Sequence, residues 1–342
     1  MRPFPWHAAI LERLMAQRER LPHALLVQGA AGIGKTRFAQ ALAAAVLCET
    51  PRNGLACGEC ASCHWLGQGN HPDYREVIPE AAEEDEGAEE EAPAKAEKAK
   101  SVVIKIEQVR ALADFMSLST HRAGWRVLVL HPAEALHPNA ANALLKTLEE
   151  PPPRTLIVLV SDRPARLLAT IRSRCRPLVL PMPAPAEALA WLRAEGVPEP
   201  QAALAAAGGA PLLAQRLAEP DEAQFRRKLV SELAKPGGAD ALQFAGSVDR
   251  EGVERFIHGM QIWVHDLVRV RLAGKPRHHV DHTAALAARA RSSDLDRLLA
   301  LDRELAEARR LAAHPLNARL LAEHLLTAYN RATGSTGASN GR

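Results

Sequence analysis

One stretch of eight residues, GAAGIGKT at 29–36, constrains the fold of this 342-residue chain more than any other. It matches the P-loop pattern G-x-x-x-x-G-K-[ST] in full. The apolar segment LPHALLVQG (21–29) leads into it as a buried strand, and TRFAQALAAAVLCE (36–49) follows with apolar residues at helical spacing. A strand, a glycine loop and a helix in this order predict an α/β domain with a phosphate-binding loop.

Each polar group in this loop has a part in binding phosphate. Gly29, Gly32 and Gly34 let the backbone turn its N–H groups inward, Lys35 reaches the β- and γ-phosphates, and Thr36 offers its hydroxyl to Mg²⁺. The start of the following helix adds a positive dipole end. We therefore expect the loop to hold ATP or ADP; the alternative is a glycine turn that no longer binds nucleotide.

Hydrolysis of a bound nucleotide needs a further carboxylate at the end of a neighbouring strand, where it holds Mg²⁺. The expected strand RVLVL (126–130) is followed by His131 and Pro132, and the next acid is Glu134. Histidine is a poor ligand for Mg²⁺, which prefers oxygen, and proline has no ligand atom. We therefore expect a bound nucleotide to persist without hydrolysis by this chain.

The cysteines suggest a metal site. Four of the five cysteines lie in one short segment within 48–64: Cys48, Cys57, Cys60 and Cys63. In a reducing compartment this clustering favours metal over disulfides, and four thiolates form a closed tetrahedral zinc site with a structural role. The neighbouring His64 is a substitute ligand to consider, and four reduced cysteines without metal are the alternative.

The rest of the chain has a simple organisation. RVLVL and TLIVLVS (155–161) have the continuous apolar content of strands in a parallel sheet covered on both faces. Residues 80–100 are acidic, then lysine-rich, without apolar periodicity, and we expect them to be a disordered insertion. After PMPAP (181–185) the pattern becomes helical, in keeping with an aromatic fraction of only 4%.

Composition and charge narrow the classes of function. The net charge of +3 does not by itself imply nucleic-acid binding, although the acidic segment hides a more basic remainder. No apolar run approaches the length of a membrane span, and the N-terminus lacks the apolar stretch of a signal peptide. We therefore expect a cytoplasmic protein with no membrane partner.

The segment SRC at 173–175 contains Arg174, which can act as an arginine finger on a phosphate held by a neighbouring subunit. Taken alone the signal is weak, because Arg172, Arg174 and Arg176 alternate as they would in a solvated basic strand or loop.

Several of these segments together resemble one protein family. The P-loop, the cysteine cluster, HPDY (71–74), NALLKTLEEPP (142–152) and TIRSRC (170–175) occur in this order in bacterial clamp-loader subunits of the AAA+ class. The resemblance covers about residues 5–330.

Within the family, the ATPase type called tau or gamma has an acidic pair where this chain has His131 and Pro132. That type also has an arginine in a lid segment that reads GGAPLLAQ (208–215) here. Ser161 is the nearest match to the first sensor residue. The chain thus looks like the delta prime type.

The resemblance implies a RecA-like P-loop AAA+ domain with a four-cysteine zinc module at 1–178, a small helical lid at 179–220 and an all-helical collar at 221–331. Residues 332–342 are then expected to be a disordered tail. It also implies that Arg174 is an arginine finger acting in trans. The implied partners are delta and tau/gamma subunits in a five-subunit ring, the sliding clamp, and primer–template DNA contacted through the complex.

The chain would then belong to the DNA polymerase III holoenzyme, a DNA-directed DNA polymerase (a nucleotidyltransferase), without activity of its own. Two other functions remain open from the residues. One is an active tau/gamma-type motor ATPase with an unusual magnesium site. The other is a zinc-dependent nucleic-acid-binding protein with a vestigial P-loop, although no aromatic stacking platform or concentrated basic helix is apparent.

Overall fold

The computed structural model describes residues 1–80, 103–117, 120–121, 124–235, 238–250, 252–311 and 317–334. The chain divides into two compact units, Met1–Glu187 and Ala188–Arg342. The insertion expected at 80–100 lies outside the described residues except for Glu80, and the expected tail lies outside them from residue 335 onward.

The first unit is built around a five-stranded sheet in the order β2-β3-β4-β1-β5, in which every neighbouring pair is parallel. The strands are β1 (Ala24–Gln28), β2 (Tyr74–Val77), β3 (Arg126–Leu130), β4 (Thr155–Ser161) and β5 (Arg176–Val179). All residues of β3 and β4 are buried, which explains their uninterrupted apolar sequences. The predicted α/β domain with a buried parallel sheet is confirmed.

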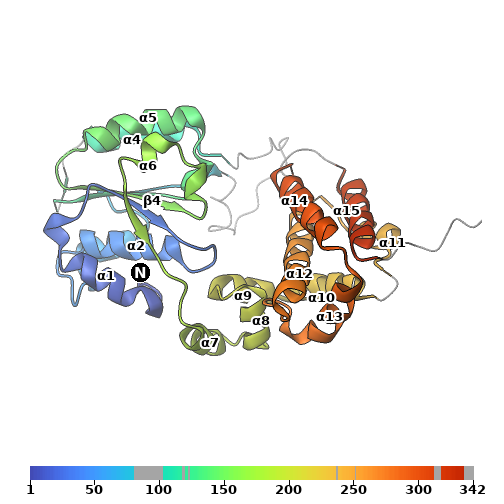
Figure 1. The fold of residues 1–342 in the computed structure, drawn as a ribbon. Coiled ribbons are helices and arrows are strands. Elements are labelled where there is room, and N and C mark those ends of the chain that lie inside the picture. The colour runs from blue at the N-terminus through green and yellow to red at the C-terminus, as the bar shows by residue number, and fades with distance from the viewer. Residues whose placement is uncertain are drawn as a thin grey trace, which may run out of the picture. The chain divides into compact units, whose positions relative to one another are not determined.

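Helices cover both faces of this sheet (Figure 1). On one face lie α1 (Ala8–Met15) and α2 (Lys35–Leu47), and on the other lie α4 (Ile106–Ser117), α5 (Pro138–Glu149) and α6 (Ala169–Arg172). The described part of this unit also contains the helix α3 (Ala61–Gly67) and the short 3-10 turns η1 (Pro5–His7), η2 (Arg18–Arg20), η4 (Ala133–Ala135) and η5 (Pro164–Arg166).

The helix α5 shows how the sequence directs this packing. Pro138 occupies its first turn, where a missing N–H costs no hydrogen bond. Leu144 and Leu148, four residues apart, are each 1% exposed and face the core that α5 shares with α4 and the sheet. The helix ends at Glu149, just before three consecutive prolines.

The sheet continues beyond residue 178, where the sequence placed the end of the first domain. The strand β5 ends at Val179, and the backbone N–H of the buried Leu180 donates to the Gln28 carbonyl at 2.8 Å. A single parallel bridge also joins Ile104 to Leu136 outside the sheet.

The second unit is helical throughout its described residues, as predicted. Its elements are α7 (Pro185–Ala194, which begins in the first unit), α8 (Pro200–Ala206), α9 (Pro211–Leu217), α10 (Pro220–Ala234), α11 (Ala241–Ala245), α12 (Val253–Ala273), η6 (Val280–His282), α13 (Thr283–Ser292), α14 (Leu295–Leu311) and α15 (Ala318–Ala332).

This unit contains two hydrophobic clusters, one formed by residues between Ala188 and Ala214 and the other by residues between Leu229 and Ala332. In the larger cluster the Trp263 indole N–H donates to the Tyr329 hydroxyl at 2.9 Å, which links α12 to α15. Ala332 and Thr333 are buried at the end of α15, although the sequence placed them in the tail. Ala332 belongs to the larger cluster, and the Thr333 hydroxyl donates to the Tyr329 carbonyl at 3.0 Å.

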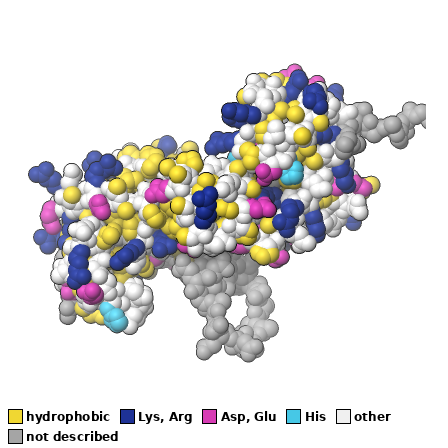
Figure 2. All heavy atoms as spheres, turned by 90° about the horizontal axis from the view of Figure 1, so that it is seen from below, with side chains coloured by type: hydrophobic (Ala, Val, Ile, Leu, Met, Phe, Trp, Pro, Cys, Tyr) yellow, Lys and Arg dark blue, Asp and Glu magenta, His cyan; other side chains and the backbone are white. Residues whose placement is uncertain are grey.

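Charged side chains are dispersed over the face drawn in Figure 2. On the face drawn in Figure 2, Lys and Arg are scattered among acidic and hydrophobic side chains, and no single basic patch dominates. Among the helices of the described residues, none combines the length and hydrophobicity needed to cross a bilayer.

Candidate functional site

The glycine loop lies between β1 and α2, and its glycines are there for steric reasons. Gly32 and Gly34 have φ of 75° and 92°, a region that L side chains rarely adopt. A Cβ added to Gly29 would lie 2.6 Å from the Leu180 carbonyl oxygen. The loop thus has the positive-φ turns and the close backbone approach that a phosphate cradle requires.

The polar residues of the loop lie at the start of α2, as predicted. Lys35 is only 4% exposed, and its ammonium group donates to the Ala30 carbonyl at 2.5 Å and forms an ion pair with Asp162. Thr36 follows in the first turn of α2 and is half-buried. Asp162 was not identified from the sequence, although its position directly after a predicted buried strand was a signal.

Residues of the N-terminal segment pack against the glycine loop and against α2. The Trp6 indole N–H donates to the carbonyl of Ile33, a fully buried loop residue, at 2.9 Å. The neighbouring His7 is fully buried against Phe38 of α2, and neither ring nitrogen has a hydrogen-bond partner. Burial, with the nearby charge of Lys35, lowers the pKa of His7 to about 4, so this histidine is neutral at pH 7.

No carboxylate follows directly after β3, as predicted, but a carboxylate of the neighbouring strand β2 lies close to the end of β3. The His131 ring contacts Glu76 of β2, with 2.8 Å between Nε2 and Oε1. Gln40 and the Tyr74 hydroxyl also donate to the Glu76 carboxylate, at 2.9 and 2.7 Å. Burial opposes ionisation of Glu76, but these hydrogen bonds outweigh it and lower its pKa.

Glu76 was not recognised from the sequence because only the pairing of β2 with β3 brings it beside His131. Its two oxygens are engaged by three side chains, so the arrangement is a closed polar network. Glu134, in η4, uses Oε1 to accept the backbone N–H of Asp162 at 3.1 Å. The hydroxyl of the buried Ser161 accepts the N–H of Arg163 at 3.0 Å.

Arg174 lies between α6 and β5, and its two buried neighbours leave its side chain partly exposed to solvent. Ile171 and Cys175 are buried on either side, whereas the Arg174 side chain remains 34% exposed. Its guanidinium donates to the Thr170 carbonyl at 2.9 Å and to Glu149 Oε1 at 2.5 Å. Glu149 is the last residue of α5, so the TLEEPP segment holds the guanidinium of the SRC segment.

The four clustered cysteines converge as predicted. Their sulfur atoms all lie within 4.8 Å of one another: Cys48, Cys57, Cys60 and Cys63. Two sulfur pairs, Cys48–Cys60 and Cys57–Cys63, are 3.9 Å apart. Four sulfurs at about 2.3 Å from a tetrahedral Zn²⁺ would be about 3.8 Å apart, so the donor set fits zinc. His64 is outside this group, and its Nε2 lies 3.1 Å from the Gln68 amide nitrogen.

The electrostatics of this cluster also suit a cation. Backbone N–H groups at 57–60 and 63 point at sulfur atoms, at 3.3 to 3.4 Å, and hydrogen bonds of this kind stabilise thiolates. Hydrogen bonds, first from the Thr50 side chain, lower the pKa of Cys57 to about 6, whereas burial raises the pKa of Cys48 and raises that of Cys63 to about 12. The cluster can hold a metal ion, and its closed tetrahedral form leaves no position for a substrate.

The whole chain can be compared with known proteins. The profile of the family described as "DNA polymerase III, delta subunit" matches residues 7–184. The DNA polymerase III subunit delta' of Pseudomonas aeruginosa is 40% identical over 236 residues, which cover 68% of this chain and 66% of that protein. The Escherichia coli K12 protein of the same name is 33% identical over 286 residues, which cover 82% of this chain and 78% of the relative.

Among solved structures, a DNA polymerase III gamma subunit-related protein from Thermotoga maritima aligns over 96% of this chain and 99% of its own, with 16% identity and a TM-score of 0.46. The profile match extends over half of the chain, and the E. coli relative is covered for more than two-thirds of its length. This chain therefore belongs to the family of DNA polymerase III delta prime subunits.

Proposed function

We propose that this chain is the non-hydrolysing delta prime subunit of a DNA polymerase III clamp loader. In this role it helps to load the sliding clamp on primed DNA. It supplies Arg174 to the nucleotide of a neighbouring ATPase subunit, and its own P-loop holds ATP or ADP without hydrolysis.

The observation that carries this proposal is the end of β3. Efficient hydrolysis needs a carboxylate here that holds Mg²⁺ and a group that orients water. In this chain His131 occupies the position, and its ring is tied to Glu76. Because Gln40 and Tyr74 bind the same carboxylate, coordination of a magnesium ion by Glu76 would require breaking this network.

The position of Arg174 supports a role in trans. A guanidinium presents donors in a planar fork that matches phosphate oxygens and keeps its charge at any physiological pH. Arg174 is partly exposed and held by one exposed carboxylate, so it can exchange Glu149 for a phosphate at small cost. Its backbone is anchored through the buried Ile171 and Cys175, which limits the loss of entropy on binding.

The cysteine cluster supports a structural zinc ion. Bound zinc would cross-link the end of α2, through Cys48, to the loop and helix that carry Cys57, Cys60 and Cys63. Clustered cysteines stay reduced in a reducing compartment, which is why we assign the chain to the cytoplasm.

The partners follow from this role. We infer that the chain joins delta and tau/gamma subunits in a five-subunit ring through a helical collar at 221–331, with a lid at 179–220. The separate hydrophobic clusters before and after residue 220 support this division. The scattered basic side chains in Figure 2 favour contact with primer–template DNA through the complex rather than through this subunit alone.

One reconstitution tests the proposal. The purified chain is mixed with delta, the motor subunit and the clamp, and assembly, bound nucleotide and ATP turnover are measured together. We expect stoichiometric assembly, and no turnover by the chain alone. The rival motor ATPase predicts turnover by the isolated chain that is lost in Lys35→Ala. Tight DNA binding by the isolated chain that disappears when zinc is removed would instead support the zinc-dependent nucleic-acid-binding alternative.

A further inference from the structure

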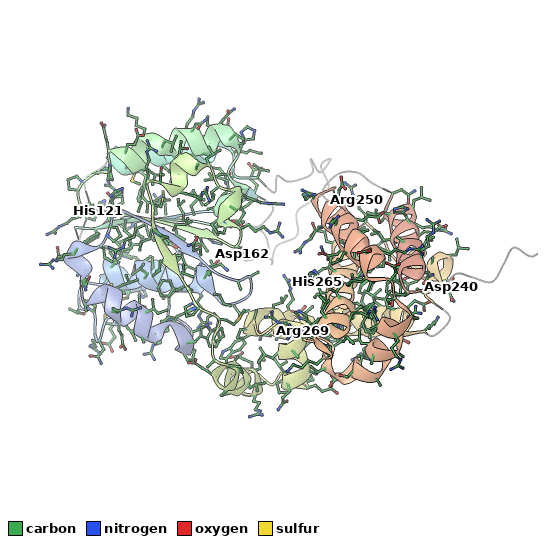
Figure 3. All side chains as sticks on the ribbon, viewed as in Figure 1. His121, Asp162, Asp240, Arg250, His265 and Arg269 are labelled. Atoms are coloured by element: carbon green, nitrogen blue, oxygen red, sulfur yellow. The ribbon has the colours of Figure 1, made fainter. Side chains whose placement is uncertain are left out.

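The topology of the sheet brings an acidic residue to the glycine loop. The strand β4 pairs in parallel with β1, and Ser161 is opposite Gln28 at their carboxyl ends. The next residue of each strand therefore emerges at the same edge. Gly29 begins the loop on one side, and Asp162 follows β4 on the other, at the position labelled in Figure 3.

Asp162 binds the lysine on which phosphate recognition depends. The Lys35 ammonium is nearly inaccessible, and its contacts are the Ala30 carbonyl and the Asp162 carboxylate. The Asp162 side chain is itself 44% exposed, so it faces the open side of the loop. Its backbone is fixed because its N–H donates to Glu134 Oε1 at 3.1 Å.

The charges at this edge of the sheet therefore disfavour a triphosphate. In a P-loop of this type the lysine contacts the β- and γ-phosphates. Here the buried ammonium of Lys35 is already neutralised by Asp162, and the Glu134 carboxylate lies against the backbone of Asp162. A triphosphate brings one more charged phosphate to this edge than a diphosphate does, and that charge would be repelled by the two carboxylates.

We propose that Asp162 is a specificity-determining residue, which makes the loop prefer nucleoside diphosphate to nucleoside triphosphate by occupying Lys35 in place of a γ-phosphate. This inference depends on the proposal that the loop holds nucleotide, and it goes further by naming the phosphate state. A loop that keeps ADP would act as a fixed part of the ring, because it would not exchange with the ATP that drives the neighbouring subunits.

Equilibrium binding of ADP and of ATP to the full chain tests this, by calorimetry in buffer with excess Mg²⁺. Asp162→Asn keeps the shape of the side chain and removes its charge. We expect the wild type to bind ADP more tightly than ATP. In Asp162→Asn the affinity for ATP should rise about tenfold or more, the effect of one charge contact near a protein surface, with a much smaller change for ADP.

Two controls separate this effect from others. Glu107→Gln removes the same charge from an exposed position on α4, on the other face of the sheet, and should leave both affinities unchanged. Asp162→Ser should reproduce the gain in ATP affinity if the asparagine variant is poorly folded.

The possible failures are distinguishable. An unchanged ratio of ATP to ADP affinity in both Asp162 variants, with both nucleotides bound, would overturn the role of Asp162 but leave nucleotide binding by the loop intact. Failure of the wild type and of both variants to bind either nucleotide would overturn this inference and the proposed nucleotide site together. Neither result would affect the proposed role of Arg174, which is measured in the assembled loader.

Discussion

Replacing Arg174 by alanine separates a catalytic role in trans from a role in folding, because the structure predicts very different magnitudes for the two. The side chains of Arg174 and Glu149 are 34% and 49% exposed, and an exposed ion pair contributes about 0.2–1 kcal/mol to stability. The hydrogen bond to the Thr170 carbonyl adds about 0.5–1.5 kcal/mol at most. The loss of folding free energy should therefore not exceed about 2.5 kcal/mol, and the variant should fold and assemble.

The expected loss at the neighbouring ATP site is much larger. An arginine finger typically accelerates phosphoryl transfer by about 10³–10⁵-fold, which corresponds to about 4–7 kcal/mol of transition-state stabilisation. We expect ATP turnover at that site to fall by about 10³–10⁵-fold in a loader that carries Arg174→Ala. Arg174→Lys should recover little, because lysine keeps the charge but lacks the planar fork.

The assay is ATP turnover and clamp loading by the reconstituted loader, with size-exclusion chromatography for assembly and thermal unfolding of the isolated chain. Arg172→Ala is the matched control, since Arg172 is exposed two residues earlier on α6 and should leave turnover unchanged. Turnover and clamp loading at the wild-type level in a correctly assembled Arg174→Ala loader would refute the reasoning.

Three further predictions concern the metal, the pH and the loop. The wild-type chain should contain one zinc ion by mass spectrometry, and Cys57→Ser should lower both the zinc content and the melting temperature. Cys175→Ala, which replaces the buried fifth cysteine, should keep the zinc. Retention of zinc by Cys57→Ser would contradict the proposed metal site. Because the pKa of His7 is about 4 in the folded state and about 6.5 in the unfolded state, the unfolded state binds the proton first as pH falls. Stability should decrease by about 1–2 kcal/mol between pH 7 and pH 5, and urea titrations at both pH values should show a smaller decrease in His7→Phe; an equal decrease would exclude His7 as the cause. Gly29→Ala places a methyl group 2.6 Å from a backbone oxygen and should lower the free energy of unfolding in urea by about 1–3 kcal/mol. Gly67→Ala has nothing within 4 Å of the added Cβ and should leave that free energy almost unchanged. Equal losses in the two variants would refute the steric argument.

The sequence was most informative where function depends on residues that are close along the chain. The P-loop and the cysteine cluster are local, because a turn, a helix start or a chelate ring involves residues only a few positions apart. Parallel strands could also be predicted, since burial on both faces requires continuous apolar residues, as in β3 and β4. The absence of a carboxylate directly after β3 was likewise visible in His131 and Pro132.

Partners brought together by the sheet could not be predicted in the same way. Glu76 reaches His131 through the pairing of β2 with β3, across 55 positions of sequence. Asp162 reaches Lys35 because β4 inserts next to β1. An acid that follows a strand is common in a sequence, and which lysine it meets depends on strand order, which the periodicity of single segments does not encode.

The sequence by itself thus determined the kinds of chemistry available: a phosphate-binding loop, four thiols for a metal, and an arginine in the segment SRC. Only the tertiary structure decided the state of these groups. It holds Lys35 against Asp162, His131 against Glu76, and Arg174 against Glu149. The physical reason is that charge interactions depend on distance in space, and the order of strands and helices sets those distances.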